Sequence, residues 1–256
     1  MKNFWESRLE AHGHTGYSDQ STYCFDQQCR LGVFERWLDA AGMRPDKALD
    51  FGCGIGDFSR VLLRRGWRVV AYDPFVTPKI SDPHLTITRD REQIATHGPF
   101  NLIVSITVLD CILDDGTFAD ELRLVHKHLS PNGAFFFLEY SISDDRAPLN
   151  DYQAFRSTAQ WRAALDGAGL SLDSAEPYFH PTFAPIDAWK AYGRNLIVRG
   201  VARTERIIGR IGVLDLLRKS VASRCLQHSP YKPPDKSPLN LLCGRNYRNE
   251  RTTVGQ

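Results

Sequence analysis

One short segment, ALDFGCGIGDFSRVL at residues 48–62, places three glycines at alternate positions directly after an apolar run. The apolar run predicts a buried strand, and the amphipathic residues after the glycines predict a helix. Glycine has no Cβ, so Gly52, Gly54 and Gly56 let the backbone turn tightly and approach a ligand closely. The chain is therefore expected to form a strand, a ligand-binding turn and a helix in this order.

Strand-like and helical patterns alternate along the chain. The apolar runs that predict strands lie at residues 48–51, 67–72, 85–88, 100–106, 134–140, 171–179 and 239–246. The main helical patterns lie at residues 29–42, 57–66, 115–130 and 157–170, and SPNG at 130–133 predicts a turn. Such alternation predicts an α/β fold with a doubly wound, mostly parallel sheet and helices on both faces.

Composition excludes several classes of protein. The 256 residues are 42% hydrophobic and 24% charged, with a net charge of +2, so bulk charge does not indicate nucleic-acid binding. The charged N-terminal segment lacks the apolar stretch of a secretory signal, and no apolar run is long enough to cross a membrane. Six cysteines without a C-x-x-C pair indicate reduced thiols, so we expect a cytoplasmic protein without a metal site.

The glycine turn distinguishes two kinds of ligand. A dinucleotide fingerprint, G-x-G-x-x-G, that starts at Gly52 requires glycine at position 57, where this chain has Asp57. A carboxylate there repels a pyrophosphate, and Asp50 adds a second negative charge just before the turn. The two acids favour a cationic ligand. S-adenosylmethionine (SAM), which carries a sulfonium and an ammonium group, has that character.

Further candidate cofactor contacts follow the next strands. Asp73 ends the second strand, before Pro74, where a carboxylate can accept hydrogen bonds from both ribose hydroxyls. Asp90 follows the third strand and is either an acceptor for the adenine amino group or a solvated loop charge. Ser105 and Ile106 end the fourth strand, at the sheet edge that is expected to face the ligand.

Taken in order, five segments resemble the class I SAM-dependent methyltransferases. The segments are ALDFGCGIG, VVAYDP, FNLIVSITVLDCILD, HLSPNGAFFFLEYS and WRAALDGAGLSL. The resemblance covers residues 29–178 and 239–246 and implies a seven-stranded Rossmann-like sheet, whose last strand is antiparallel beside the fifth. It divides the chain into an N-terminal helical lid (1–46), a SAM-binding core (47–179), a basic helical insertion (180–238) and a last strand with a tail (239–256).

The N-terminal region carries a second resemblance. CRLGVFERWL, at residues 29–38, is similar to the entry helix of ubiquinone-pathway O-methyltransferases, in which an arginine meets the SAM carboxylate. This implies such a contact for Arg30, whose guanidinium suits a carboxylate, although a surface arginine is the other interpretation. Residues 12–27 are expected to form a lid with Tyr17 or Tyr23 on the ligand, or else a packing strap.

The fold does not identify the methyl acceptor. A base is needed only when the nucleophile is protonated, and Asp110 and His180 are the candidates. We expect methyl transfer to O or N of a small molecule, such as a sugar or a secondary-metabolite intermediate. The alternatives are an enzyme of the same fold that releases methylthioadenosine and a SAM-binding protein without catalysis.

The segment at residues 193–224 predicts a basic amphipathic helix. Three interpretations stay open: contact with an anionic membrane surface, a clamp on an anionic acceptor, and a lid or homodimer helix whose basic face is solvated. No DNA-binding module is recognisable, so the expected partner is a small-molecule acceptor.

Overall fold

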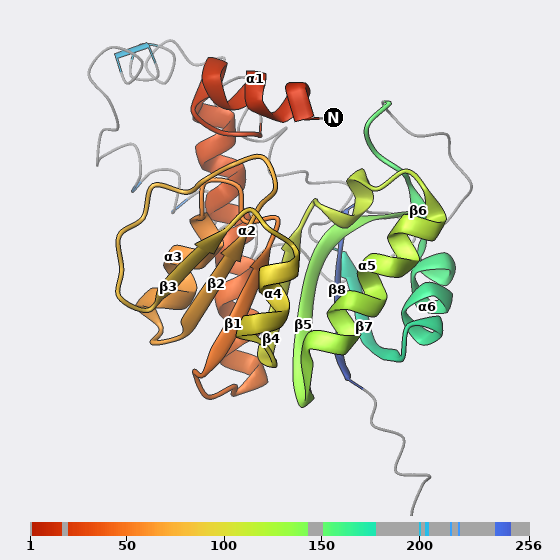
Figure 1. Ribbon diagram of the computed structural model, residues 1–256. Helices are drawn as coiled ribbons and strands as arrows, with labels where there is room; N and C mark the ends of the chain where they lie inside the picture. The colour runs from red at the N-terminus through yellow and green to blue at the C-terminus, as the bar shows by residue number, and fades with distance from the viewer. Residues whose placement is uncertain are drawn as a thin grey trace, which may run out of the picture.

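A computed structural model describes residues 2–16, 20–142, 151–177 and 239–246, together with residues 200, 203, 204, 216 and 220. The strands of the sheet follow the order β3-β2-β1-β4-β5-β8-β7 (Figure 1). Their bounds are β1 Lys47–Phe51, β2 Arg68–Tyr72, β3 Leu85–Thr88, β4 Phe100–Ile106, β5 Leu129–Ile142, β7 Leu170–Pro177 and β8 Leu239–Asn246.

Only β8 runs antiparallel to its neighbours in this order, and it lies between β5 and β7. A short additional strand, β6 (Arg156–Ser157), pairs with the end of β5. The expected doubly wound sheet with an antiparallel last strand beside the fifth is therefore confirmed, and β6 adds to it.

Helices cover both faces of the sheet because its central strands bury side chains on both sides. The helices are α1 Lys2–His12, α2 Gln20–Ala41, α3 Asp57–Arg64, α4 Glu92–His97, α5 Asp115–His128 and α6 Thr158–Gly167, with a 3₁₀ turn at Leu109–Cys111. On β5, Phe136 and Leu138 pack with α2 and α3, while Phe135 and Phe137 pack on the side of α4, α5 and α6.

Two helix ends follow their local sequence. Gly42 ends α2 with φ +59°, a conformation that glycine adopts without strain. Ser157 caps α6: its hydroxyl accepts from the Gln160 N–H, and the Gln160 side chain accepts from the Ser157 N–H. This capping box is worth about 1 kcal/mol and fixes where α6 leaves β6.

The expected turn at residues 130–133 is wrong. Ser130 to Gly133 lie within β5, where the pairing with β4 shifts register between the Phe100–Leu129 and Leu102–Ala134 pairs. The extra residues are accommodated as an irregularity of the strand, so the helix–strand junction falls directly at Leu129. The helix α2 is also longer than expected, because it begins at Gln20.

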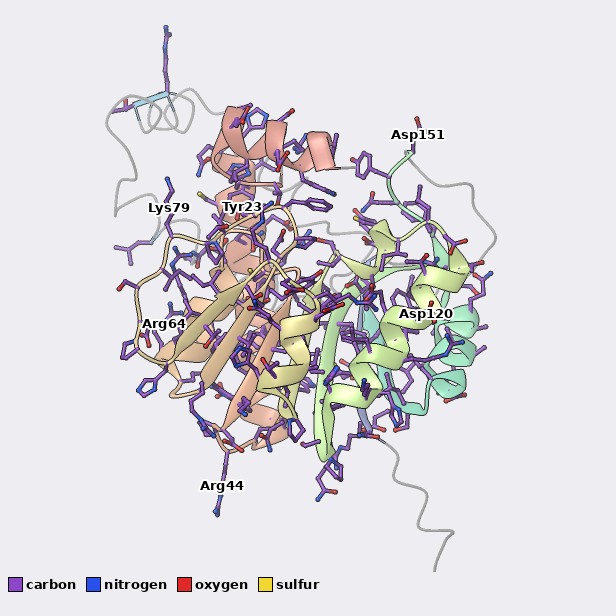
Figure 2. The ribbon with its side chains drawn as sticks, in the orientation of Figure 1. Tyr23, Arg44, Arg64, Lys79, Asp120 and Asp151 are labelled. Atoms are coloured by element: carbon purple, nitrogen blue, oxygen red, sulfur yellow. The ribbon has the colours of Figure 1, made fainter. Side chains whose placement is uncertain are left out.

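The carboxyl ends of β1, β2, β4 and β5 meet at one edge of the sheet, because these strands are parallel. The helix α1 and the first turns of α2 lie beyond this edge (Figure 1). Exposed charges such as Arg44, Arg64 and Asp120 point away from the body, whereas Tyr23 lies inward with 8% exposure (Figure 2). No helix of the described residues is long and apolar enough to span a membrane.

Candidate active site

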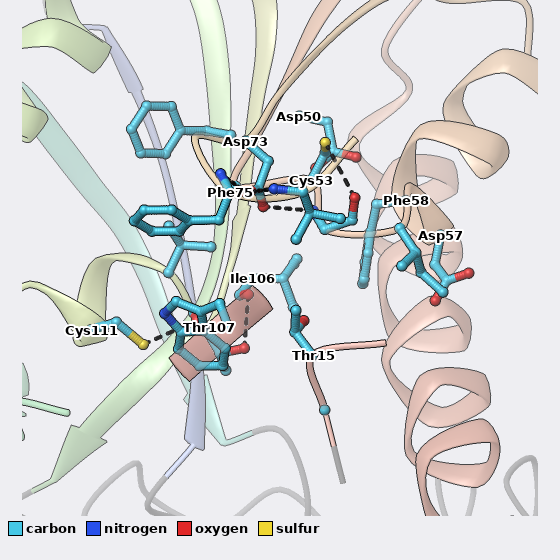
Figure 3. A pocket seen from close by; sticks show the side chains of 18 of the residues that line it. Thr15, Asp50, Cys53, Asp57, Phe58, Asp73, Phe75, Ile106, Thr107 and Cys111 are labelled. Carbon is cyan, nitrogen blue, oxygen red and sulfur yellow. Dashed lines mark hydrogen bonds between the residues drawn. The ribbon is translucent and has the colours of Figure 1, made fainter. Parts of the chain in front are cut away.

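A cavity of about 430 Å³ opens at the carboxyl ends of the central strands. Its wall is formed by the glycine turn after β1, the ends of β2, β4 and β5, and the helices α1 and α2. Figure 3 shows Cys53 and Asp73 on one side of this space and Thr107 and Cys111 on another. This is the edge at which open parallel α/β sheets bind their ligands.

The glycine turn requires glycine at its first position. Gly52, Gly54 and Gly56 all have positive φ, of +74°, +52° and +82°. A Cβ on Gly52 would lie 2.3 Å from Cγ2 of Val108. A Cβ on Gly54 would meet nothing closer than Thr15, at 3.7 Å, so the backbone here faces open space in the cavity. Gly56 completes the turn but is not part of the cavity wall.

Asp73 ties the turn to the loop after β2. Its Oδ2 accepts from the Gly54 N–H at 3.0 Å, and its Oδ1 accepts from the N–H groups of Phe75 and Val76 at 2.8 and 2.9 Å. The carboxylate lines the cavity together with Pro74. Asp73 therefore lies at the cavity and holds the two loops together, while its contact with a ribose stays a prediction.

Asp50 lies beneath the turn at the end of β1 and also lines the cavity. Its side chain is 2% exposed and accepts from the Ser59 hydroxyl at 2.6 Å. Burial raises the pKa of Asp50 to about 7, with the neighbouring Asp73 adding to the shift.

The helix α2 presents a polar face to the cavity. Arg30 forms an ion pair with Asp26, Nε to Oδ2 at 2.7 Å, and its Nη1 donates to Oγ1 of Thr107 at 3.2 Å. Tyr23 donates to Oδ2 of Asp57 at 2.7 Å, across the glycine turn. The predicted cofactor contacts Arg30 and Tyr23 therefore both line the cavity, as does Ile106.

Besides Gly56, three predicted site residues do not line the cavity. Asp90 is exposed, and its Oδ1 accepts from the Glu92 N–H at the start of α4. It therefore lies away from the cavity in which the adenine contact was expected. Ser105 is fully buried and donates to Oε1 of Glu139 at 2.7 Å. Ser105 therefore contacts a buried carboxylate and not the cavity.

Asp110 is the third of these residues, and this placement does not support its predicted role as a base. Its carboxyl group is 0% exposed, accepts from the Tyr140 N–H at 3.2 Å and lies 3.3 Å from Sγ of Cys111. Burial raises the pKa of Asp110, so a proton is retained more readily, but the group does not reach the cavity.

Two other predicted residues, Tyr17 and His180, lie outside the described residues, as does nearly all of the basic segment 193–224. Their roles stay predictions, and so do the four domain boundaries. Among the described residues, no group of His, Cys, Asp and Glu is arranged to hold a metal ion.

Sequence reasoning missed the aromatic part of the wall. Phe4 and Trp5 of α1 line the cavity together with Tyr152. The ring centroids of Phe4 and Tyr152 are 4.8 Å apart, and those of Trp5 and Tyr152 are 6.0 Å apart. An aromatic pair in an otherwise charged N-terminal helix was the available signal. Glu121 of α5 also lines the cavity, and burial raises its pKa.

A glycine turn, an acid at the end of β2 and an arginine-bearing entry helix around one cavity define a class I SAM-dependent methyltransferase site. A family model described as a methyltransferase domain matches residues 27–177. The chain belongs to this family, and its cofactor is SAM. The open backbone at Gly54, the Asp73 carboxylate and the Asp26–Arg30 pair fit the bare turn, the ribose and the charged end that this cofactor requires.

The individual proteins that this chain resembles share little sequence identity with it. The chain is 27% identical over 112 residues to the ubiquinone biosynthesis O-methyltransferase of Pseudomonas aeruginosa, an alignment that spans 39% of this chain and 47% of the relative. It therefore spans about half the length of the curated relatives that it matches.

Two solved structures share the fold. The 1,6-didemethyltoxoflavin-N1-methyltransferase of Burkholderia thailandensis has a TM-score of 0.58 at 14% identity, covering 96% of this chain and 87% of that one. A phosphoethanolamine-type N-methyltransferase of Haemonchus contortus has a TM-score of 0.58 at 14% identity, covering 96% and 60%.

Proposed function

We propose that the protein transfers the methyl group of SAM to an oxygen or nitrogen atom of a small-molecule acceptor that binds beneath α1. The observation that carries this proposal is the set of residues that line the cavity. Asp73 and the glycine turn account for the cofactor side, and the cavity extends beyond them to Phe4, Trp5 and Tyr152. Space bounded by both sets of residues suits two ligands side by side, as methyl transfer requires.

The chemistry of this wall favours a flat acceptor with an apolar face. The rings of Phe4, Trp5 and Tyr152 are half-buried, and aromatic rings bind planar ligands by stacking or edge contacts. Arg8 lines the same region and adds a positive charge, which suits an acidic group on the acceptor. A secondary-metabolite intermediate with a phenolic or heterocyclic ring fits these features better than a sugar.

The matched proteins support a small-molecule acceptor. One solved relative has bound 1,6-didemethyltoxoflavin and another has bound phosphomonomethylethanolamine, each with S-adenosylhomocysteine (SAH). Membrane contact, an anionic acceptor bound by residues 193–224, a homodimer and a cytoplasmic location stay predictions.

The test is mass spectrometry of the purified protein incubated with SAM, alone and with a metabolite extract. SAH that forms only with extract, together with a metabolite heavier by one methylene, is the expected result. Methylthioadenosine from SAM alone would show that the cavity serves another reaction, and unchanged SAM in both samples would indicate a binding protein. Asp73→Ala is the control, because loss of the ribose contact should abolish SAH formation.

A further inference from the structure

Residues 13–16, which follow α1, lie over the glycine turn at the cavity. Thr15 and Gly16 belong to the cavity wall, and Figure 3 shows Thr15 there. A Cβ on Gly54 would lie 3.7 Å from Oγ1 of Thr15, so this segment faces the bare backbone of the turn. Arg8 of α1 donates to the carbonyls of Thr15 and Gly16 and ties the segment to α1. A ligand that lies along the glycine turn is therefore covered by residues 13–16.

Tyr23 of α2 is the side chain against which this segment packs. The ring of His14 stacks on the ring of Tyr23, with centroids 3.6 Å apart and planes 4° apart. Gly16 approaches the same ring so closely that a Cβ there would lie 2.5 Å from Cδ2 of Tyr23. The Tyr23 hydroxyl, whose pKa is raised by burial, donates to Asp57 at the start of α3. Tyr23 therefore connects residues 13–16 with the helix that follows the glycine turn.

The His14 ring is held in its neutral form. It is 2% exposed, and its Nε2 lies 2.9 Å from Oε1 of Gln20. An amide oxygen can only accept, so Nε2 carries the hydrogen and Nδ1 is the unprotonated nitrogen. Nδ1 is buried and has no hydrogen-bond partner among the described residues. A proton on Nδ1 would therefore be a buried donor without an acceptor, which is costly.

Groups from α1, α2 and α3 act on the charge of His14. Burial is the largest effect and lowers the pKa of His14 below its usual value, and His12 and Arg8 of α1 add to this. The bond to Gln20 of α2 and the Asp57 carboxylate of α3 act in the opposite direction, but the net shift is downward. The stacked ring is therefore neutral at neutral pH, and a protonated ring favours leaving its place on α2 for water.

We propose that His14 and Tyr23 form a latch that holds residues 13–16 over the bound cofactor, and that protonation of His14 releases it. In the released state His14 has its ordinary pKa of about 6.5, and in the latched state it takes up a proton less readily. The latched state is therefore fully favoured above about pH 6.5. Below that, it loses up to about tenfold in population per pH unit, until latched His14 is protonated too. The latch requires only the cofactor and does not depend on the identity of the acceptor.

The test measures how fast SAH leaves the protein at two pH values. Stopped-flow displacement follows dissociation through the fluorescence of Trp5, which lines the cavity. The unchanged protein should release SAH about threefold or more faster at about pH 5.5 than at about pH 7. His14→Phe keeps a ring on Tyr23 and has no proton to gain, so this ratio should be smaller by about twofold or more. Asp50 titrates near this window in both proteins, so the difference between the two ratios isolates His14.

His84→Phe is the matched control. It makes the same change at an exposed position just before β3, at the edge of the sheet opposite to the cavity. Its ratio should equal that of the unchanged protein. Gly16→Ala, whose Cβ would meet the Tyr23 ring, should speed SAH release at both pH values and serves as the deciding variant if His14→Phe does not fold.

The outcomes separate the latch from the proposed function. Equal ratios in the unchanged protein and His14→Phe would overturn the latch while SAM binding stands, and so would slower release at acidic pH. A proton NMR titration of the His14 ring without ligand should give a midpoint below about 6.5, and a midpoint at or above that value would also overturn it. If the unchanged protein binds neither SAM nor SAH, the proposed function fails and the latch fails with it, even where the titration gives the low midpoint.

Discussion

At the scale of single residues, one buried carboxylate supports the wall of the cavity beyond β4. Glu139 is 0% exposed, accepts from the Ser105 hydroxyl and accepts from the N–H groups of Val108 and Asp110 at 3.1 Å. These bonds flank Thr107, which has φ +52°, a strained value for a β-branched residue. The network therefore keeps Thr107 against Arg30.

The close approach of Gly52 to Val108 leads to a prediction for Gly52→Ala. A Cβ there would lie 2.3 Å from Val108 on a backbone with φ +74°, so the turn must shift. We expect about 1–3 kcal/mol lower stability in urea unfolding and weaker SAH binding in calorimetry. Gly167→Ala is the control, since its Cβ would meet nothing within 4 Å. Equal stability of the two variants would contradict the steric explanation.

At the scale of elements, α1 closes the cavity with little core of its own. No residue of α1 whose burial is described is fully buried, and a helix of 11 residues is marginal by itself. Its contacts include the ring cluster of Phe4 and Trp5 with Tyr152, bonds from Arg8 to the carbonyls of Thr15 and Gly16, and an ion pair of Glu6 with Arg89. The position of α1 therefore depends largely on half-buried and polar side-chain contacts.

This dependence predicts the effect of Tyr152→Ala on α1. Loss of the central ring removes two aromatic contacts, each worth about 0.5–1.5 kcal/mol, so amide exchange in residues 2–12 should accelerate about fivefold or more. Hydrogen-exchange mass spectrometry measures this, and the strands should exchange as before. Leu113→Ala, at an exposed position outside the cluster, is the control. Unchanged exchange in α1 would show that other contacts hold it.

At the scale of the whole molecule, the features that could be predicted from the sequence were those marked by a regular pattern of residues. The alternation of apolar runs predicted the sheet, and the glycines with Asp73 predicted where the cavity opens. It did not show which polar side chains reach that cavity, because Asp90 and Asp110 follow strands just as Asp73 does. Their different positions depend on local bonds, to the start of α4 and to Tyr140, which no periodicity reveals.

The aromatic part of the cavity wall was missed for a related physical reason. Phe4 and Trp5 contact Tyr152, nearly 150 residues away in sequence, and spacing within α1 gives no sign of that partner. The ion pair of Asp26 and Arg30 was not predicted, because the helix was expected to begin at residue 29, and its burial follows from the packing of α2 on the sheet. Long-range packing thus decided the parts of the site that sequence patterns left open.

Buried carboxyl groups under the ligand edge of the sheet make global stability depend on pH. Burial raises the pKa values of Asp50, Asp110 and Glu139, that of Asp50 to about 7. An unfolded aspartate has a pKa of about 3.9, so between about pH 4 and 7 the folded protein holds a proton at Asp50 that the unfolded chain has lost. The stability that this proton represents is complete below about pH 4 and is lost as the pH rises through about 7.

Asp50→Asn isolates this effect, because the amide has no proton to lose and still accepts from Ser59. Between about pH 4.5 and 6.5, the free energy of unfolding of the unchanged protein should fall more steeply than that of Asp50→Asn, by up to about 1.4 kcal/mol per pH unit. Urea unfolding at several pH values measures both slopes. Asp39→Asn should keep the steeper slope, since Arg65 lowers the pKa of exposed Asp39 and moves its titration below this window. Parallel slopes for the unchanged protein and Asp50→Asn would mean that Asp50 is ionised when folded, and that its carboxylate contributes a full negative charge beneath the cofactor.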